Sequence, residues 1–134
     1  MMMKQVVVAG IVLLGASVAA QADGDPAAGE KVFAQCKACH NIGEGATNKI
    51  GPELNGVIGR KAGTIDTFKG YGESLKKMGA DGLVWDAEQL AKYVHNPREF
   101  NPGTKMSFVG LKKDEDVANV IAYLSQFDAD GKKK

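Results

Sequence analysis

Both cysteines of this chain, Cys36 and Cys39, are separated by two residues, and His40 follows the second one directly. This C-x-x-C-H segment is the attachment signature of c-type haem. Two thiols at this spacing can add to the two vinyl groups of haem while the adjacent imidazole binds the iron on one face. We therefore expect Cys36 and Cys39 to form thioethers to one covalent haem c, with His40 as an axial iron ligand.

Other uses of the motif fit the chain less well. A thioredoxin-like redox pair follows a strand in a βαβ unit, whereas these cysteines follow a helical pattern. A zinc site needs four ligands, and the only further histidine is the distant His95. A chance pentapeptide is the third alternative, but it would have to collect both cysteines and one of the two histidines.

The first 22 residues have the features of a secretory signal peptide. Lys4 gives a positive n-region, an apolar run follows from Val6 to Val18, and Ala20-Gln21-Ala22 is an A-x-A cleavage site. We expect residues 1–22 to be removed and residues 23–134 to form one domain in the periplasm. An uncleaved anchor is the alternative, although the apolar run is shorter than the roughly 20 residues that a membrane span needs.

The charge balance of the chain argues against polyanionic partners. The 17 Lys and Arg residues and 16 Asp and Glu residues give a formal net charge of +1, which becomes zero when Lys4 is removed with the signal. A chain without a basic field is a poor candidate for binding nucleic acid or an anionic membrane. We expect neither partner.

The distribution of glycine, capping residues and apolar residues over the domain predicts an all-α fold with long loops. Glycine makes up 17 of 134 residues and is concentrated in residues 41–71, which favours loops there. Capping residues and apolar periodicity predict three main helices and a short one, and no strand of useful length. The expected helices cover residues 26–36, 73–78, 86–96 and 114–124, with an extended loop over 97–112 and a solvated tail over 131–134.

The second axial ligand decides between electron transfer and catalysis. Beyond the signal, the candidates are Met78, Met106 and His95. Met106 lies in a loop shaped by proline and glycine, which can present its thioether over a flat face. Met78 is more typical of packing, and His95 of a helix C-terminus. For these reasons we prefer Met106. Iron held by His40 and a methionine has no vacant position and a raised reduction potential, which favours electron transfer over catalysis.

The remaining motifs resemble those of class I cytochromes c, closest to the bacterial cytochrome c2 branch that is also similar to mitochondrial cytochrome c. The resemblance implies the cytochrome c fold, wrapped around one haem, for residues 23–134. Three lengths depart from it: Tyr71 to Trp85 is three residues longer than in the mitochondrial pattern, Phe33 to Cys36 is one shorter, and the insertion that many cytochromes c2 carry before the methionine is absent. Besides the C-x-x-C-H motif, the matching positions are Gly29, Gly51-Pro52, Gly59-Arg60, Tyr71, Trp85, Tyr93, Asn96-Pro97, Pro102 to Met106, Phe108 and Tyr123.

The resemblance also implies roles for individual residues. Taken singly, the aromatic residues could be ordinary core and Arg60 an ordinary surface charge; their joint order favours the haem. The implied roles are a Pro52 carbonyl that orients His40, propionate contacts from Arg60, Tyr71 and Trp85, support of the Met106 sulfur by Tyr93 and Thr104, Phe108 at the exposed haem edge, and a crossing of the first and last helices at Gly29 and Tyr123.

The implied function is that of a mobile, monomeric one-electron carrier, not an enzyme. Its partners would be membrane-bound redox complexes with an acidic docking patch: a cytochrome bc1-type donor, and an oxidase or reaction-centre-type acceptor. A membrane-tethered carrier and a haem enzyme or gas sensor with a displaceable sixth ligand are the alternatives. The resemblance implies a ring of cations around the haem edge and acids on the opposite pole, which would steer the protein to an acidic patch. Ordinary solvated charges are the alternative. The cations are Lys37, Lys49, Arg98, Lys105, Lys112 and Lys113, and the acids are Asp114, Glu115 and Asp116.

Overall fold

The computed structural model describes residue 10 and residues 24–134, so the predicted signal peptide lies almost entirely outside the described residues. No helix in this described part is both long enough and apolar enough to cross a bilayer. The chain forms helices α2 (Pro26–Phe33), α3 (Glu73–Ala80), α4 (Ala87–His95), α5 (Pro97–Phe100) and α6 (Asp114–Leu124), and two short strands, β1 (Arg60–Lys61) and β2 (Val84–Trp85).

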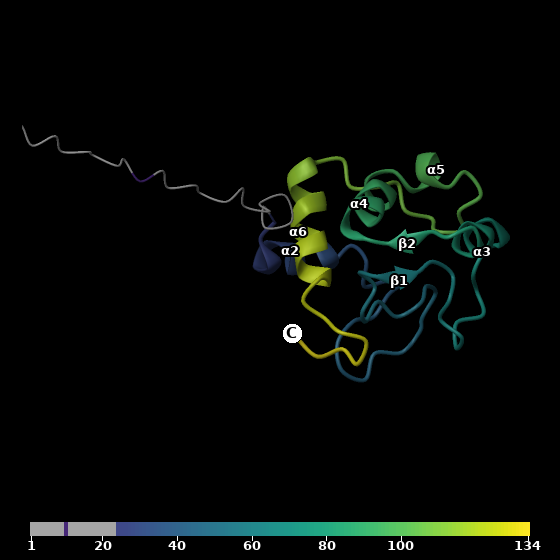
Figure 1. The fold of residues 1–134 in the computed structure, drawn as a ribbon, viewed down its shortest axis with the longest axis horizontal. Helices are drawn as coiled ribbons and strands as arrows, with labels where there is room; N and C mark the ends of the chain where they lie inside the picture. Colours follow the sequence, from purple (N-terminus) through teal and green to yellow (C-terminus); the bar gives the residue numbers. More distant parts are fainter. Residues whose placement is uncertain (1–9, 11–23) are drawn as a thin grey trace, which may run out of the picture.

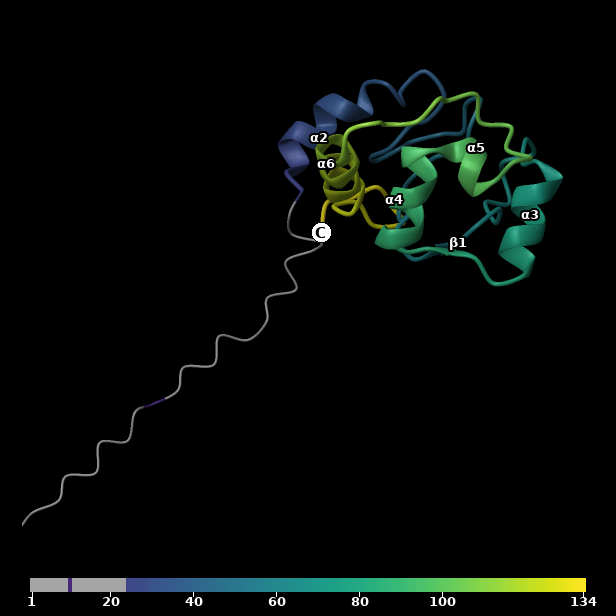
Figure 2. The same cartoon turned by 90° about the horizontal axis from the view of Figure 1, so that it is seen from above.

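Helices α2 and α6 pack against each other at one end of the domain (Figure 1 and Figure 2). Gly29 permits this approach, because a Cβ at that position would overlap the backbone carbonyl of Asn119. The Asn119 side chain accepts a hydrogen bond from the backbone N–H of Asp25 at 2.8 Å. Phe33 and Tyr123 pack at the crossing with ring centroids 5.3 Å apart. The crossing at Gly29 and Tyr123 is thus present as predicted.

Helix α4 begins and ends where the sequence indicates. The Asp86 carboxylate accepts a hydrogen bond from the backbone N–H of Gln89 at 2.7 Å, which completes the predicted cap. Leu90 and Tyr93 are its buried residues. The face that carries them therefore turns toward the interior.

The two strands form an antiparallel ladder of two residues each, although no strand of useful length was expected. Arg60 pairs with Trp85, and Lys61 pairs with Val84. A ladder this short adds little stability by itself. The ladder instead determines position: it holds Arg60 and Trp85, two residues predicted to contact the haem, side by side.

The first helix ends earlier than the sequence indicates. It was expected to reach Cys36 but stops at Phe33, and residues 34–39 form turns. The backbone N–H of Cys36 bonds to the carbonyl of Phe33 at 2.7 Å, which is the tighter spacing common at helix ends. The prediction was wrong because apolar periodicity does not distinguish a last helical turn from this tighter one.

Residues 97–112 are not wholly a loop, since α5 occupies Pro97–Phe100. The Asn96 side chain accepts a hydrogen bond from the backbone N–H of Glu99 at 3.3 Å. Pro97 takes the first helical position, where its missing N–H costs nothing. The Asn-Pro pair that ends α4 therefore also starts α5, a double role that the sequence prediction missed.

The C-terminal segment is folded where a solvated tail was expected. Phe127 and Lys133 form an isolated antiparallel bridge, and the backbone N–H of Lys134 donates to Gln126 at 2.8 Å. Gly131 is buried with a φ of +80°, and a Cβ there would overlap the backbone carbonyl of Gly43. Within the predicted tail 131–134, residues 132–134 are exposed and Gly131 is buried, so the prediction was wrong at Gly131.

Candidate functional site

A cavity of about 330 Å³, with largely apolar walls, is lined by residues of helices α2, α3, α4 and α6, of both strands and of the loops between them. The competing ligands Met78 and His95 are absent from its wall in the described part of the chain. Every residue predicted for the site lies on that wall: Cys36, Cys39, His40, Arg60, Tyr71, Trp85, Tyr93, Thr104, Met106 and Phe108.

The two thiols are brought to the cavity by the turns that follow α2. The backbone N–H groups of Cys39 and His40 both donate to the carbonyl of Cys36, at 3.1 and 2.9 Å. Both cysteines are free and half-buried. Burial, with a smaller contribution from Cys39, raises the pKa of the Cys36 thiol to about 11. The thiol is therefore uncharged at neutral pH, and its surroundings suit an uncharged thioether.

The tautomer of His40 is set by the backbone of the following loop. Its Nδ1 lies 2.7 Å from the carbonyl oxygen of Pro52. Since a carbonyl can only accept, Nδ1 carries the proton and Nε2 keeps its lone pair for a metal. Gly51 makes the contact feasible, because a Cβ at this position would overlap the imidazole.

The electrostatics of the pocket keep this imidazole neutral. Burial is the main cause that lowers the pKa of His40, and the bond to Pro52 opposes it. The positive charges of Arg60 and Lys49 lower the pKa further. A neutral imidazole with a free Nε2 is the form in which histidine binds metals.

The loop that carries Met106 is held by a hydroxyl pair. The Tyr93 and Thr104 hydroxyl oxygens are 2.6 Å apart, and the backbone N–H of Met106 donates to Thr104 at 3.1 Å. A second bond, from the backbone N–H of Thr104 to the carbonyl of Asn101 at 2.9 Å, closes the turn. Burial raises the pKa of Tyr93, so its hydroxyl stays protonated at neutral pH.

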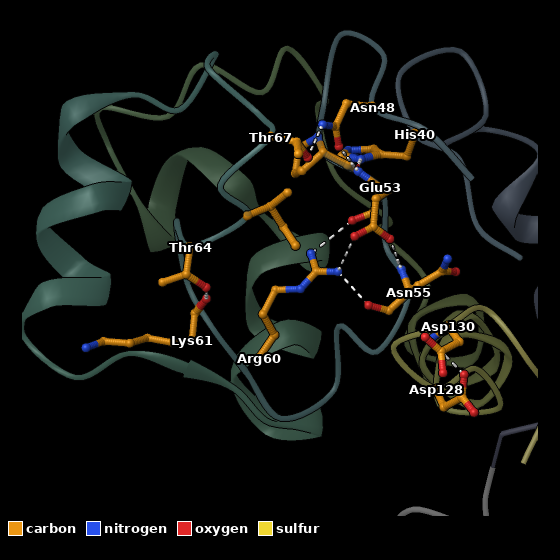
Figure 3. Close-up of polar contacts among 12 residues, drawn as sticks. His40, Asn48, Glu53, Asn55, Arg60, Lys61, Thr64, Thr67, Asp128 and Asp130 are labelled. Atoms are coloured by element: carbon orange, nitrogen blue, oxygen red, sulfur yellow. Dashed lines mark hydrogen bonds and ion pairs between the residues drawn. The ribbon is translucent and has the colours of Figure 1, made fainter. Parts of the chain in front are cut away.

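On another part of the wall, Arg60 is tied to the loop that follows Pro52 (Figure 3). Its guanidinium donates to the backbone oxygens of Glu53 at 2.9 Å and Asn55 at 2.6 Å. Tyr71 accepts a hydrogen bond from the backbone N–H of Ile65 at 3.1 Å, which leaves its own O–H free to donate.

Trp85 completes this wall from β2. Its ring packs on Tyr93 at a centroid distance of 5.0 Å and on Phe100 at 5.8 Å. The indole is buried, with 6% of its residue surface exposed. Aromatic packing therefore joins the Arg60 side of the cavity to the Tyr93 side.

Sequence reasoning missed two residues of this arrangement, Glu53 and Asn55. The Asn55 side chain bonds to both the N–H and the carbonyl of Gly43, at 2.8 and 2.9 Å, and closes the loop. An acid directly after Pro52 and close to Arg60 was the available signal. This signal did not identify Glu53, because acidic residues are common on protein surfaces and the loop has no hydrophobic periodicity that would indicate burial.

The donor set and the walls fit haem c. Two thiols, an imidazole with a free Nε2 and a thioether line one cavity with largely apolar walls. Ser74 Oγ and Asn101 Nδ2, from residues on the same wall, are buried without a partner among the described residues. Buried polar atoms of this kind are usually satisfied by a bound group or water. The geometry defines a small helical protein of the c-type haem class.

Comparison with known proteins agrees with this class. The family model described as Cytochrome c matches residues 26–128. A cytochrome c-554 of Methylosinus trichosporium is 53% identical over 127 residues, covering 95% of this chain and 91% of that protein. A cytochrome c2 of Blastochloris viridis is 48% identical over 125 residues, covering 93% of this chain and 95% of that protein.

A solved structure gives the same result for the fold. The crystal structure of cytochrome c2 from Rhodobacter sphaeroides superposes with a TM-score of 0.72 at 42% identity, covering 83% of this chain and 99% of that one. The chain belongs to the cytochrome c family, in the class I bacterial cytochrome c2 branch. It is an electron-transfer protein with the cytochrome c fold and covalently bound haem c.

Proposed function

We propose that this protein is an exported one-electron carrier, rather than an enzyme, whose haem iron is bound by His40 and Met106. The observation that carries this proposal is the shared cavity. Met106 lines it together with His40 and both cysteines, whereas Met78 and His95 do not. An imidazole from His40 and a thioether from Met106 would together hold the iron, which would favour electron transfer and raise the potential relative to two imidazoles.

The residues of the chain hold and tune the site. When bound, haem c supplies an iron that exchanges one electron between the ferric and ferrous states. Cys36 and Cys39 anchor the group, and the Pro52 carbonyl keeps His40 in the tautomer that can ligate. Thr104 and Tyr93 fix the loop of Met106. The apolar wall excludes water, which limits the rearrangement that accompanies a change of charge.

A pair of methionine variants tests the ligand. Replacing Met106→Leu should abolish the sulfur-to-iron absorption band of the ferric protein and lower its midpoint potential. Met78→Leu is the matched control and should leave both unchanged. The ligand assignment is wrong if Met78→Leu removes the band or if Met106→Leu retains it.

We further propose that the protein docks, as a monomer, on acidic patches of redox complexes. The supporting observation is that the implied docking cations are all exposed and make no ion pair within the described residues: Lys37, Lys49, Arg98, Lys105, Lys112 and Lys113. Such a patch accelerates encounters by steering, and salt screens it. A bc1-type donor and an oxidase or reaction-centre-type acceptor are the proposed partners.

Ionic strength tests this docking proposal. The rate of electron transfer to an acidic partner complex should fall steeply as salt rises, and neutralising Lys105→Gln should flatten that dependence. Lys61→Gln, a cation in the β1 strand that is outside the proposed surface, is the control. A rate that does not vary with salt would contradict steering.

Periplasmic location is proposed from the N-terminal sequence. Residues 1–22 have the three regions of a secretory signal, and haem attachment to a C-x-x-C-H motif suits an exported protein. A mass spectrum of the purified protein tests both points together. It should show a haem adduct on a chain that begins at Asp23; a chain that retains Met1 would support the tethered alternative.

A further inference from the structure

Among the residues that the structure describes, Glu53 is the one glutamate that is not exposed. Its side chain retains 17% of its accessible surface, whereas the remaining glutamates lie in exposed positions of the described residues. It directly follows Pro52, whose carbonyl holds His40. A carboxylate is rarely buried without a partner, because burial removes its hydration.

Each oxygen of this carboxylate has a defined partner. Oε2 accepts a hydrogen bond from the backbone N–H of Asn55 at 2.7 Å, and Oε1 lies 3.4 Å from a guanidinium nitrogen of Arg60. The backbone N–H of Glu53 donates to the side chain of Asn48 at 2.9 Å. Figure 3 shows the guanidinium aimed at this segment.

The orientation of Arg60 does not depend on the carboxylate alone. The backbone oxygens of Glu53 and Asn55 already accept two shorter hydrogen bonds from the same guanidinium, at 2.9 and 2.6 Å. What the carboxylate adds is negative charge beside a cation whose side chain is only 11% exposed. Charges in such a setting interact strongly because little water screens them.

The guanidinium of Arg60 and the imidazole of His40 lie on the wall of the same cavity. One segment holds both, since the Pro52 carbonyl pairs with His40 and the carbonyl of the next residue, Glu53, accepts from Arg60. A positive charge on this wall disfavours additional positive charge in the cavity. Ferric iron carries one more positive charge than ferrous iron. An uncompensated Arg60 would therefore favour the ferrous state, and a carboxylate paired with it would offset that preference.

Resting on the proposed role as a one-electron carrier, we propose that Glu53 is a positioning residue that lowers the reduction potential. It acts through Arg60, by offsetting the positive charge that the guanidinium places on the wall of the cavity that His40 also lines. Of this pair only Arg60 lines the cavity, so the carboxylate of Glu53 need not touch the cofactor.

The direct test removes the charge and keeps the shape. Glu53→Gln retains a carbonyl oxygen for the Asn55 N–H but carries no negative charge. At a fixed potential, the ratio of ferrous to ferric protein should rise roughly three- to tenfold, and tenfold equals about 59 mV for a one-electron couple. Glu53→Asp keeps the charge, so its midpoint potential should stay close to that of the unmodified protein.

A matched control separates this effect from the general loss of an acid. Glu44→Gln removes an exposed carboxylate from the same loop region and should leave the midpoint potential unchanged. If Glu53 only stabilised the loop, Glu53→Gln would lower the melting temperature without changing the potential. An unchanged or lowered potential in Glu53→Gln overturns the proposal.

The unmodified holoprotein allows a second measurement if Glu53→Gln does not mature. In protein labelled with 13C-glutamate, the ferric-minus-ferrous infrared spectrum should contain a carboxylate band that shifts between the two states. The absence of such a band overturns the proposal. Failure of Met106 ligation would instead appear as a missing sulfur-to-iron band in the unmodified protein, so the two failures are distinguishable.

Discussion

His40 donates its Nδ1 proton to the carbonyl oxygen of Pro52 across 2.7 Å, and the preceding residue, Gly51, lies against the imidazole ring. The loop therefore fixes both the tautomer and the position of the imidazole before any metal is considered. The same loop continues into Glu53 and Asn55, which hold Arg60. His40 and the partly buried Arg60 of the cavity wall are thus supported by one short segment.

This relationship predicts a high cost for a side chain at position 51. A Cβ there would overlap the imidazole, so Gly51→Ala must displace either the ring or the loop. Overpacking of this kind costs about 1–3 kcal/mol. Guanidinium unfolding of the holoprotein should show a loss in this range, together with a lower yield of protein carrying haem.

Gly72→Ala is the matched control for this experiment. A Cβ at Gly72 would meet only the flexible side chain of Lys105, at 3.2 Å, and φ at this position is −73°. We expect a smaller loss, of roughly 0.5–1 kcal/mol, because Gly72 is the N-cap of α3 and alanine is a poorer N-cap than glycine. Equal losses in the two variants would contradict the specific role of Gly51.

The second prediction concerns Thr104. Its hydroxyl oxygen accepts the Met106 N–H and pairs with the Tyr93 hydroxyl. Thr104→Val keeps the shape but leaves these two groups without a partner, at a cost of about 1–3 kcal/mol. The free energy of unfolding should fall by this amount, and the sulfur-to-iron band should disappear at a lower temperature than in the unmodified protein.

A double-mutant cycle with Tyr93→Phe isolates the hydroxyl pair. If the two hydroxyls interact, the cost of Thr104→Val should be smaller in the Tyr93→Phe background, where one unpaired group has already been removed. Strict additivity of the two costs would show that the 2.6 Å contact contributes no coupling.

The sequence predicted the parts of this molecule that local signals determine. The cap at Asp86, the apolar face of α6 and the turn at Pro102 depend on residues within a few positions of one another. The same holds for Cys36, Cys39 and His40, whose spacing is itself the chemical requirement. Most of the other predicted site residues came from the resemblance to class I cytochromes c, and the structure places them on the same cavity wall.

The parts that could not be predicted depend on contacts between distant residues. Nothing near Gly131 in the sequence indicates that its backbone packs on Gly43. The burial of Glu53 likewise results from how the loop closes onto Arg60, not from its neighbours in the chain. From sequence patterns alone, a glycine near the C-terminus is assigned to a solvated tail and a lone glutamate to the surface, because most residues of these kinds lie there.

The third prediction is a loss of stability at alkaline pH. Burial is the main cause that raises the pKa of each of the three tyrosines, Tyr71, Tyr93 and Tyr123. In the unfolded chain tyrosine titrates near pH 10, so above that pH the unfolded state binds fewer protons than the folded state. The contribution of the three protonated tyrosines to the free energy of unfolding is therefore fully present below about pH 10. It decreases as the pH rises above that value.

Two measurements on the holoprotein check the alkaline prediction. The phenolate absorbance of the folded protein should rise at a higher pH than that of the same protein in guanidinium. The free energy of unfolding should be lower at pH 11 than at pH 8. Identical phenolate titrations in the folded and denatured states would contradict the raised pKa values.

The last prediction concerns the folded C-terminal segment, whose key residue is Gly131. Its φ of +80° is strained for a residue with a Cβ, and that Cβ would overlap the carbonyl of Gly43. Gly131→Ala should therefore lower the free energy of unfolding by about 1–3 kcal/mol through backbone strain and overpacking. Lys134→Ala changes only an exposed side chain and should be neutral. Because Gly43 is also held by Asn55, amide hydrogen exchange around residues 43–55 should accelerate in Gly131→Ala. Unchanged exchange in these residues would show that the C-terminal segment does not support the loop over 43–55.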